Sequence, residues 1–209
     1  MSHPFGSLLF TPAIKALQER HGSRAQYARL ASREGPARAL GPDEAAFIAS
    51  RDSFYMATVG STGWPYVQHR GGPPGFVKVF DEHTLAFADY AGNRQFVTAG
   101  NLATDDRAAL ILVDYPAQAR LKVLGHVQVL EGQAAKEYWP KVIDPQYGAR
   151  PERVFVVRVE AFDWNCPQHI TPRFTQAEIE HALTPMAERL RELEQENERL
   201  RGELARRRA

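Results

Sequence analysis

Polar side chains gather at the ends of apolar runs between residues 54 and 114. One run closes with Gln68-His69-Arg70, and a later one closes with Ala88-Asp89 and is followed by Asn93-Arg94-Gln95. Two arginines that converge can donate charge-assisted hydrogen bonds to one anion, such as a phosphate. The alternative is that each arginine is a solvated charge at the edge of a sheet.

Short strands and one helix must position these side chains. The apolar runs are rich in Val, Phe, Tyr and Thr and are separated by glycine-containing turns, which is typical of strands. A helix is expected from Asn93 to Ala103, with Asn93 as its cap and Arg94 in its first turn, where a phosphate can bind. The runs expected to be strands are FYMATV, YVQHR, FVKVF, LAFADY, AALILVDY and RVFVVRVEAF.

The order of these elements resembles the FMN-binding split barrel of the pyridoxamine 5′-phosphate oxidase-like family. In that family a strand with a basic end is followed by a second strand, a Ser/Asn-Arg-Lys-like turn, a helix and an apolar strand. The resemblance covers Asp43 to Phe162. The counterparts in this chain are Gln68-His69-Arg70, Thr84 to Asp89, Asn93-Arg94-Gln95, Asn101 to Arg107, Ala108 to Tyr115 and the next strand, Arg120 to Val127.

The resemblance implies an FMN-binding split β-barrel, and the residues on either side add a helical N-terminal arm and a long C-terminal helix, so a mainly β fold with α is expected. It also implies FMN as the cofactor and a homodimer whose two flavin sites are lined by both chains. The chain departs from the oxidases proper, because Gln95 stands where the family has Lys and residues 71–75 replace part of a phosphate-contacting strand. The substrate of those enzymes is therefore not carried over.

The resemblance also assigns roles to individual residues. Arg70 and Arg94, with Lys122 or Arg120 from a neighbouring strand, are expected to bind the FMN phosphate. Gln68 is expected to face the pyrimidine edge of the flavin ring. Lesser contacts with the cofactor are expected from His69, Ala88, Asp89, Asn93 and Gln95.

A loop after the last strand combines an aromatic ring, a thiol and an imidazole: Trp164, Cys166 and His169. In the resembled family this segment brings a Trp and basic residues to the flavin, so these three are expected on the substrate side. The alternative for Trp164 is packing against the end of the barrel. Cys166 and His169 are too few ligands for a zinc site, and nothing supplies a third group to orient them as a nucleophilic pair.

Two classes of function fit this site. The first is an FMN-dependent oxidoreductase, in which the flavin performs the chemistry and no side-chain nucleophile is required, so catalytic residues stay unassigned. Its partners would be a small-molecule substrate or an electron donor such as NADH or NADPH. The alternative is a non-catalytic protein that binds a flavin, a deazaflavin or haem, since one fold hosts many functions.

Composition excludes several other classes of protein. The chain has 209 residues, 44% of them apolar, and a net charge of +1, which disfavours a nucleic-acid binder. No apolar run is long enough to span a membrane, and the first residues do not resemble a secretory signal. A single cysteine excludes an internal disulfide. A soluble cytoplasmic protein without a metal site is expected.

Three parts are expected along the chain: a helical arm (1–50), the barrel (51–174) and a C-terminal helix (175–209). The arm is expected to contain helices that begin at Pro12, Ser23 and Gly41, and to form a layer on the barrel or, alternatively, a lid or dimer strap. A further helix is expected over residues 132–142. The aromatic residues that exceed the needs of one small barrel, and so favour a dimer, are Phe76, Phe80, Phe87 and Tyr90.

The C-terminal helix carries the heptad pattern of a coiled coil. Thr175 and Glu178 form a capping box at its start, and apolar residues then alternate at spacings of four and three. Asn197 occupies one a position, which favours a parallel pair, while packing on the barrel or an antiparallel pair are the alternatives. Pro185 is expected to interrupt the helix, so that the zipper starts again there.

Overall fold

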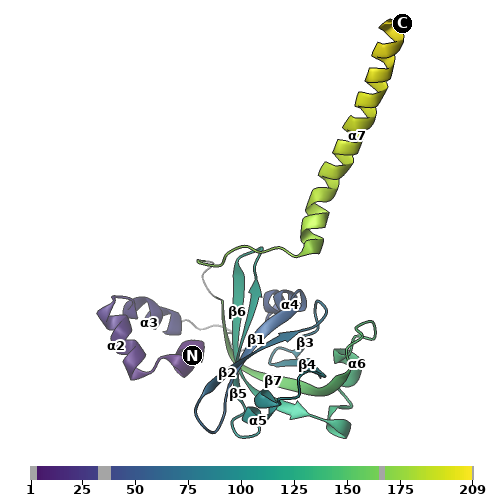
Figure 1. Cartoon of the computed structure of the whole chain (residues 1–209). Coiled ribbons are helices and arrows are strands. Elements are labelled where there is room, and N and C mark those ends of the chain that lie inside the picture. The colour runs from purple at the N-terminus through teal and green to yellow at the C-terminus, as the bar shows by residue number, and fades with distance from the viewer. Residues whose placement is uncertain (1–3, 33–38, 165–167, 209) are drawn as a thin grey trace. The chain divides into compact units, whose positions relative to one another are not determined.

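The computed structural model describes residues 4–32, 39–164 and 168–208. Its described strands form one antiparallel sheet in the order β2-β1-β5-β6-β7-β4-β3 (Figure 1). The strands are β1 (Ser53–Val59), β2 (Pro65–Gly71), β3 (Lys78–Asp81), β4 (Thr84–Tyr90), β5 (Arg107–Asp114), β6 (Ala119–Leu130) and β7 (Pro151–Trp164). Each strand expected from the sequence is present.

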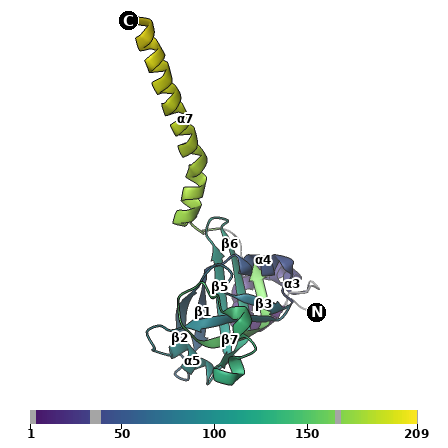
Figure 2. The ribbon, with the colours of Figure 1, turned by 90° about the vertical axis from the view of Figure 1, so that its right-hand side faces the viewer.

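The sheet curves until its two ends face each other, which makes it a barrel (Figure 2). The ring of Phe54 on β1 lies edge-on to Phe87 on β4, 5.1 Å between centroids, although three strands separate β1 from β4 in the sheet. Phe76 stacks on Phe54, and Phe155 of β7 stacks on Phe87. These buried rings fill the interior, so the expected mainly β fold is confirmed.

The aromatic residues that suggested a dimer interface are used inside one chain. Phe76 is 3% exposed and Phe87 is 1% exposed, so both belong to the core. Phe80 packs against Tyr138 on a short segment that covers the outside of β4. The prediction was wrong for Phe76 and Phe87, which belong to the barrel core, whereas Phe80 and Tyr90 pack in a second cluster. The dimer itself stays a prediction.

The N-terminal arm contains α1 (Pro4–Leu9), α2 (Pro12–Arg20), α3 (Arg24–Ser32) and α4 (Pro42–Ala49). Thr11 caps α2 as expected, since its hydroxyl accepts a hydrogen bond from the Ile14 amide at 3.4 Å. At α4, the Glu44 carboxylate accepts from the Gly41 amide at 2.9 Å. Ile48 of α4 is fully buried in the barrel core, whereas α1 was not expected from the sequence.

Residues 132–142 do not form the single helix that was expected. A 3₁₀ turn, η1 (Gly132–Ala135), is followed by α6 (Trp139–Val142). Pro140 lies in the first turn of α6, where its missing N–H costs nothing. In the middle of a longer helix the same ring would clash with the preceding turn, which explains the break.

Residues 115–117 and 171–209 group into a compact unit separate from the barrel and the arm. The described part of this unit contains α7 (Gln176–Arg208), one uninterrupted helix (Figure 1). The capping box is present: the Thr175 hydroxyl accepts from the Glu178 amide, and Glu178 accepts from the Thr175 amide at 2.7 Å. None of the described helices has the length and apolar character needed to cross a lipid bilayer.

Pro185 does not interrupt α7, so the prediction of a new start there was wrong. A proline inside a helix removes one backbone hydrogen bond and crowds the preceding turn. The Thr184 hydroxyl donates to the Glu180 carbonyl at 2.8 Å and so satisfies an acceptor next to the disturbed turn. Favourable helix formers on both sides keep the helix continuous.

Candidate functional site

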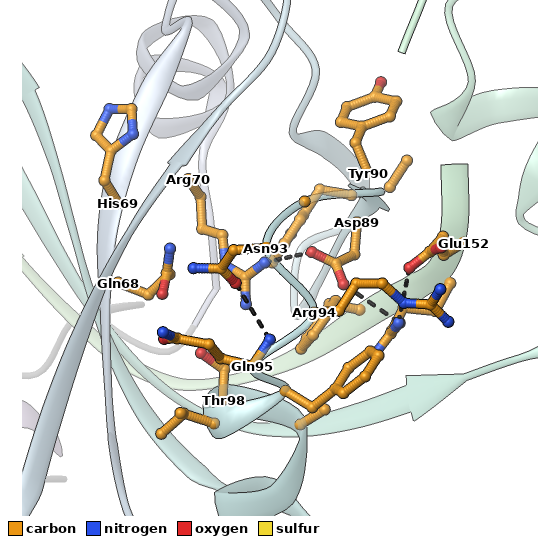
Figure 3. A pocket seen from close by; sticks show the side chains of 18 of the residues that line it. Gln68, His69, Arg70, Asp89, Tyr90, Asn93, Arg94, Gln95, Thr98 and Glu152 are labelled. Atoms are coloured by element: carbon orange, nitrogen blue, oxygen red, sulfur yellow. Dashed lines mark hydrogen bonds and ion pairs between the residues drawn. The ribbon is translucent and has the colours of Figure 1, made fainter. Parts of the chain in front are cut away.

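A cavity of about 280 Å³ lies where β2 approaches β4 and β7 (Figure 3). The turn after β4 and the start of α5 (Val97–Leu102) form its rim. The polar residues that line it are Tyr66, Gln68, His69, Arg70, Asp89, Tyr90, Asn93, Arg94, Gln95, Thr98, Glu152 and Arg153. Three of these are arginines and two are carboxylates, so the lining carries an excess of positive charge.

Asp89 stands between two of the arginines. The Arg70 guanidinium, from β2, donates a hydrogen bond to one carboxylate oxygen of Asp89. The Nε of Arg153, from β7, lies 3.3 Å from the other oxygen, and Asp89 and Arg153 are opposite each other in the β4–β7 register. The side chains of Arg153, Asp89 and Arg70 are 8%, 14% and 16% exposed, so the three charges are largely withdrawn from water.

Aromatic rings support both guanidinium groups. The Arg70 guanidinium carbon lies 5.0 Å from the centre of the Phe155 ring, and that of Arg153 lies 4.9 Å from the Phe96 ring. A cation over a ring face is attracted by the ring quadrupole, which holds each arginine in place. The Nε–H of Arg70 is buried and has no hydrogen-bond acceptor in the part of the chain that the structure describes. Such a donor favours an acceptor supplied by a ligand.

Burial raises the pKa of Asp89 above its usual value, and the charges of Arg70 and Arg153 offset this only in part. Keeping this carboxylate ionised is therefore costly. An incoming anion that accepts hydrogen bonds from the same guanidinium groups can compete with it.

The turn after β4 presents the third arginine. The Asn93 side-chain oxygen accepts a hydrogen bond from the Gln95 amide at 3.2 Å. Arg94 and Phe96 both adopt left-handed backbone angles, with φ of 59° and 56°. Right-handed helix cannot pass through such residues, so α5 begins at Val97 and not at Asn93 as expected. Arg94 thus stands on a turn and not in the first turn of a helix.

Arg94 is exposed, and its charge attracts the Glu152 carboxylate without forming an ion pair with it. Its guanidinium lies 6.0 Å from the Phe96 ring and makes no hydrogen bond or ion pair with the residues that the structure describes. Figure 3 shows its side chain on the same side of the cavity as Asp89 and Glu152. Together with Arg70 it gives the cavity two donors with unused capacity.

Helix α5 is fixed to the sheet, and it fixes the turn in front of it. The Asn101 amide donates to the buried Thr58 hydroxyl of β1 at 3.1 Å. Thr98 and Leu102, one turn apart, are buried against the barrel. These contacts hold residues 93–96 over the mouth of the cavity.

The structure brings eight of the predicted cofactor residues to this one cavity: Gln68, His69, Arg70, Ala88, Asp89, Asn93, Arg94 and Gln95. Gln68 and Arg70 alternate with His69 on β2, so His69 points to the opposite face. There its ring packs edge-on against Tyr55, 5.4 Å between centroids. The Tyr66 hydroxyl donates to the Gln68 side-chain oxygen, so this bond does not use the Gln68 amide hydrogens. Whether these residues bind a cofactor stays a prediction.

Arg120 and Lys122 do not join this group. They lie on β6, paired with Val113 and Ile111 of β5, and they do not line the cavity. The Lys122 ammonium lies 6.0 Å from the ring of Phe5 in α1. Within one chain, the predicted phosphate site therefore contains Arg70 and Arg94 without a basic residue from β6.

Trp164 and His169, two of the predicted substrate-side residues, do not line this cavity. The Trp164 indole N–H donates to the Glu44 carboxylate at 2.7 Å, and its ring lies edge-on to Phe47 at 4.8 Å. This is the packing alternative, with α4 as the neighbour. His169 is exposed and does not line the cavity, and Cys166 lies outside the described residues.

Sequence reasoning missed Arg153, Glu152 and Phe96. Arg153 lies near the start of an apolar strand, where a charged residue is ordinarily a solvated strand end. Its 7% exposure follows from the pairing of β4 with β7, which places it opposite Asp89. A charged residue near the start of an otherwise apolar strand was the one available signal. The partner of such a charge depends on strand register, which the sequence alone did not specify.

Residues 40–165, well over half of the chain, match the family model described as pyridoxamine 5′-phosphate oxidase. Similar solved structures include a candidate pyridoxamine 5′-phosphate oxidase from Lactobacillus delbrueckii, with 21% identity over 61% of this chain and 96% of that one (TM-score 0.47). HupZ of Group A Streptococcus has 16% identity over 65% and 100% (0.46). An FMN-binding protein from Syntrophomonas wolfei has 13% identity over 71% and 97% (0.45). None of the curated protein sequences matches.

Proposed function

Because this chain belongs to the pyridoxamine 5′-phosphate oxidase family, we propose that it is an FMN-dependent oxidoreductase whose cofactor phosphate binds at Arg70 and Arg94. The observation that carries the proposal is the buried Nε–H of Arg70, which has no acceptor among the described residues. Arg94 adds a second guanidinium at the same cavity, one that forms no ion pair with the described residues. Two such donors fit a dianionic phosphate better than they fit a neutral ligand.

The remaining lining residues also fit a flavin. Gln68 offers amide hydrogens to the pyrimidine edge of the ring, where donors and acceptors alternate. Ala88 and Phe155 give apolar walls that exclude water from the ring. When bound, FMN supplies hydride or electron transfer, and the chain's own residues bind and orient it. No side chain in the cavity is required as a nucleophile.

A second copy of the chain belongs to the proposal. A cavity of about 280 Å³ falls just short of the ~300–1,000 Å³ typical of sites that enclose a ligand. One chain would therefore enclose only part of an FMN molecule. The exposed face formed by β1, β2 and their turn carries Tyr55, Val59, Trp64 and Val67, each at least 41% exposed. Such an apolar surface suits contact with a second copy that completes the site.

The test begins with the purified full chain. An oxidised-flavin absorption spectrum, with FMN identified after extraction, supports the proposal. Bleaching of that spectrum by NADH or NADPH under anaerobic conditions, and recovery with an added electron acceptor, distinguishes an oxidoreductase from a passive flavin carrier. A protein that takes up no FMN when FMN is added would overturn the assignment. A spectrum of bound haem or deazaflavin would replace FMN as the cofactor.

A further inference from the structure

Helix α7 carries an apolar stripe that nothing in the described chain covers. Its members are between 44% and 68% exposed: Ile179, Leu183, Met186, Leu190, Leu193, Leu200 and Leu204. No residue of α7 is buried. Side chains of this kind, aligned along a helix of 33 residues or about 50 Å, form a surface that is costly to leave in water.

The stripe has the geometry of a coiled-coil seam. With Leu183, Leu190, Asn197 and Leu204 at a, the d positions are Ile179, Met186, Leu193 and Leu200. Because α7 passes through Pro185 without a break, the two heptads on either side belong to one seam. The seam therefore extends over four a positions, and is longer than one that started at Pro185.

The charges beside the seam are complementary between two copies. In a parallel in-register pair, each g residue lies near the e residue five positions later on the partner helix. The three charged crossings are Arg189 with Glu194, Glu196 with Arg201, and Glu203 with Arg208, and each is attractive. We propose that α7 pairs with α7 of a second copy as a parallel, in-register, two-stranded coiled coil.

The ion pairs within α7 engage the g residues of these crossings and leave the e residues without ion pairs among the described residues. Arg189 pairs with Glu192, and Arg199 pairs with both Glu196 and Glu203 on its own helix. Glu194 and Arg201, both at e, make no ion pair with described residues. Each e residue thus carries a charge opposite in sign to that of the g residue that it would face on the partner helix.

Asn197 favours the parallel arrangement over the antiparallel one. In a parallel pair the two Asn197 side chains lie opposite each other and can hydrogen-bond across the seam. In an antiparallel pair an a residue packs against d residues, so each amide would face leucine and lose its hydrogen bonds. A membrane surface is a poorer partner, because the polar face of α7 mixes glutamate and arginine in nearly equal number.

Disulfide trapping tests the arrangement in the full-length protein. Asn197→Cys places a thiol at a, where paired helices bring the two Cα atoms within disulfide range. Gln195→Cys places it at the outward f position of the same helix. Both variants also carry Cys166→Ser, so that the introduced thiol is the single one. Mild oxidation is expected to link Asn197→Cys chains into dimers and to leave Gln195→Cys chains monomeric on denaturing gels.

Charge reversal adds a second test, which distinguishes loss of the attraction between the helices from a general loss of folding. In the Asn197→Cys background, Arg189→Glu or Glu194→Arg places like charges at the same crossing and is expected to slow cross-linking severalfold. The double reversal restores attraction and the original rate. Equal cross-linking at positions 195 and 197, no cross-linking at 197, or no recovery in the double variant would overturn the parallel pair. This inference does not depend on flavin binding.

Discussion

The guanidinium of Arg70 and the carboxylate of Asp89 form an ion pair across the barrel, between strands β2 and β4, which are not neighbours in the sheet. Arg153, on the strand next to β4, approaches the same carboxylate. The contact therefore belongs both to the closure of the barrel and to the cavity. Changes at Asp89 should affect stability and anion binding together.

Asp89→Asn is expected to strengthen the response of the protein to anions. Asparagine removes a buried negative charge that burial disfavours, and it also removes the anionic partner of two largely buried guanidinium groups, so the two effects on the free energy of unfolding oppose each other. The same groups become available to a phosphate, and a ligand that binds only the folded state stabilises it. Thermal unfolding with and without inorganic phosphate or FMN measures both effects. An equal phosphate-induced shift in the two proteins would contradict the competition.

The same variant gives a pH dependence of known sign. Because burial raises the folded-state pKa of Asp89 above 3.8, the folded protein binds its proton more tightly than the unfolded chain does. The wild type should therefore lose stability relative to Asp89→Asn as the pH rises through the window between 3.8 and the raised value. The difference in free energy of unfolding between the two proteins, measured by denaturant titration, reports this. If the wild type instead gains stability relative to Asp89→Asn as the pH rises, the arginines lower the pKa of Asp89 below 3.8.

Arg94→Ala tests the phosphate site, and Arg107→Ala is its control. Arg94 forms no ion pair with the residues that the structure describes. Loss of its charge-assisted hydrogen bond to the phosphate, about 1.5–3 kcal/mol, is expected to weaken FMN binding roughly 10- to 100-fold. Arg107 lies outside the cavity and pairs with Asp105, with 2.8 Å from its Nε to the carboxylate. Its removal should leave the FMN dissociation constant unchanged. Equal FMN affinity in the two variants would remove Arg94 from the site.

Arg107→Ala should nevertheless have a local effect, a change in the pKa of Asp105, which serves as a positive control for the substitution. Hydrogen bonds from the Arg107 side chain and backbone amide lower the pKa of Asp105 to about 2 from 3.8. Without the side chain the pKa should rise toward 3.8. In the wild type, this pair contributes stability above pH 3.8 that is lost as the pH falls toward 2. An NMR titration of the Asp105 carboxyl carbon measures the shift.

Trp164→Phe separates packing from a role near the cofactor. The phenyl ring keeps the edge contact with Phe47 but loses the hydrogen bond to Glu44. Because the indole is 40% exposed, the expected loss is about 1 kcal/mol, or roughly 2–4 °C in the melting temperature. Flavin content and the rate of flavin reduction should not change. Unaltered melting with a changed reduction rate would instead place Trp164 on the substrate side.

Local patterns were enough to predict the strands and much of the site. Alternation along β2 placed Gln68 and Arg70 on one face, and composition identified the turns between strands. The start of α5 could not be predicted, because Arg94 and Phe96 adopt left-handed angles that neither residue type favours.

Long-range register explains the other omissions. Arg153 faces Asp89 because β4 pairs with β7, strands more than sixty residues apart in the chain. The position of Arg153 near the start of an apolar strand is a weak signal, and it does not identify Asp89 as the partner. The excess of aromatic residues was misread for the same reason: Phe76 and Phe87 are buried by a closure of the sheet that no local pattern reveals.

Gly125 marks a close approach between β6 and β7, and the last prediction concerns it. A Cβ at this position would lie 2.5 Å from the Arg158 carbonyl oxygen and 2.9 Å from a Val157 methyl group. The register of β6 and β7 also shifts between Leu124 and Gly125, so the backbone is already irregular there. Gly125→Ala would force the two strands apart, at a cost of about 1–3 kcal/mol.

Gly100→Ala is the matched control for that substitution. Gly100 lies within α5, and a Cβ there would meet no atom within 4 Å. Alanine restricts the unfolded chain and favours the helix, so this variant should be more stable by up to ~1 kcal/mol. Paired thermal melts are therefore expected to move in opposite directions. If Gly125→Ala melts at the wild-type temperature, β7 yields easily at this point, and the tight β6–β7 contact does not constrain the barrel.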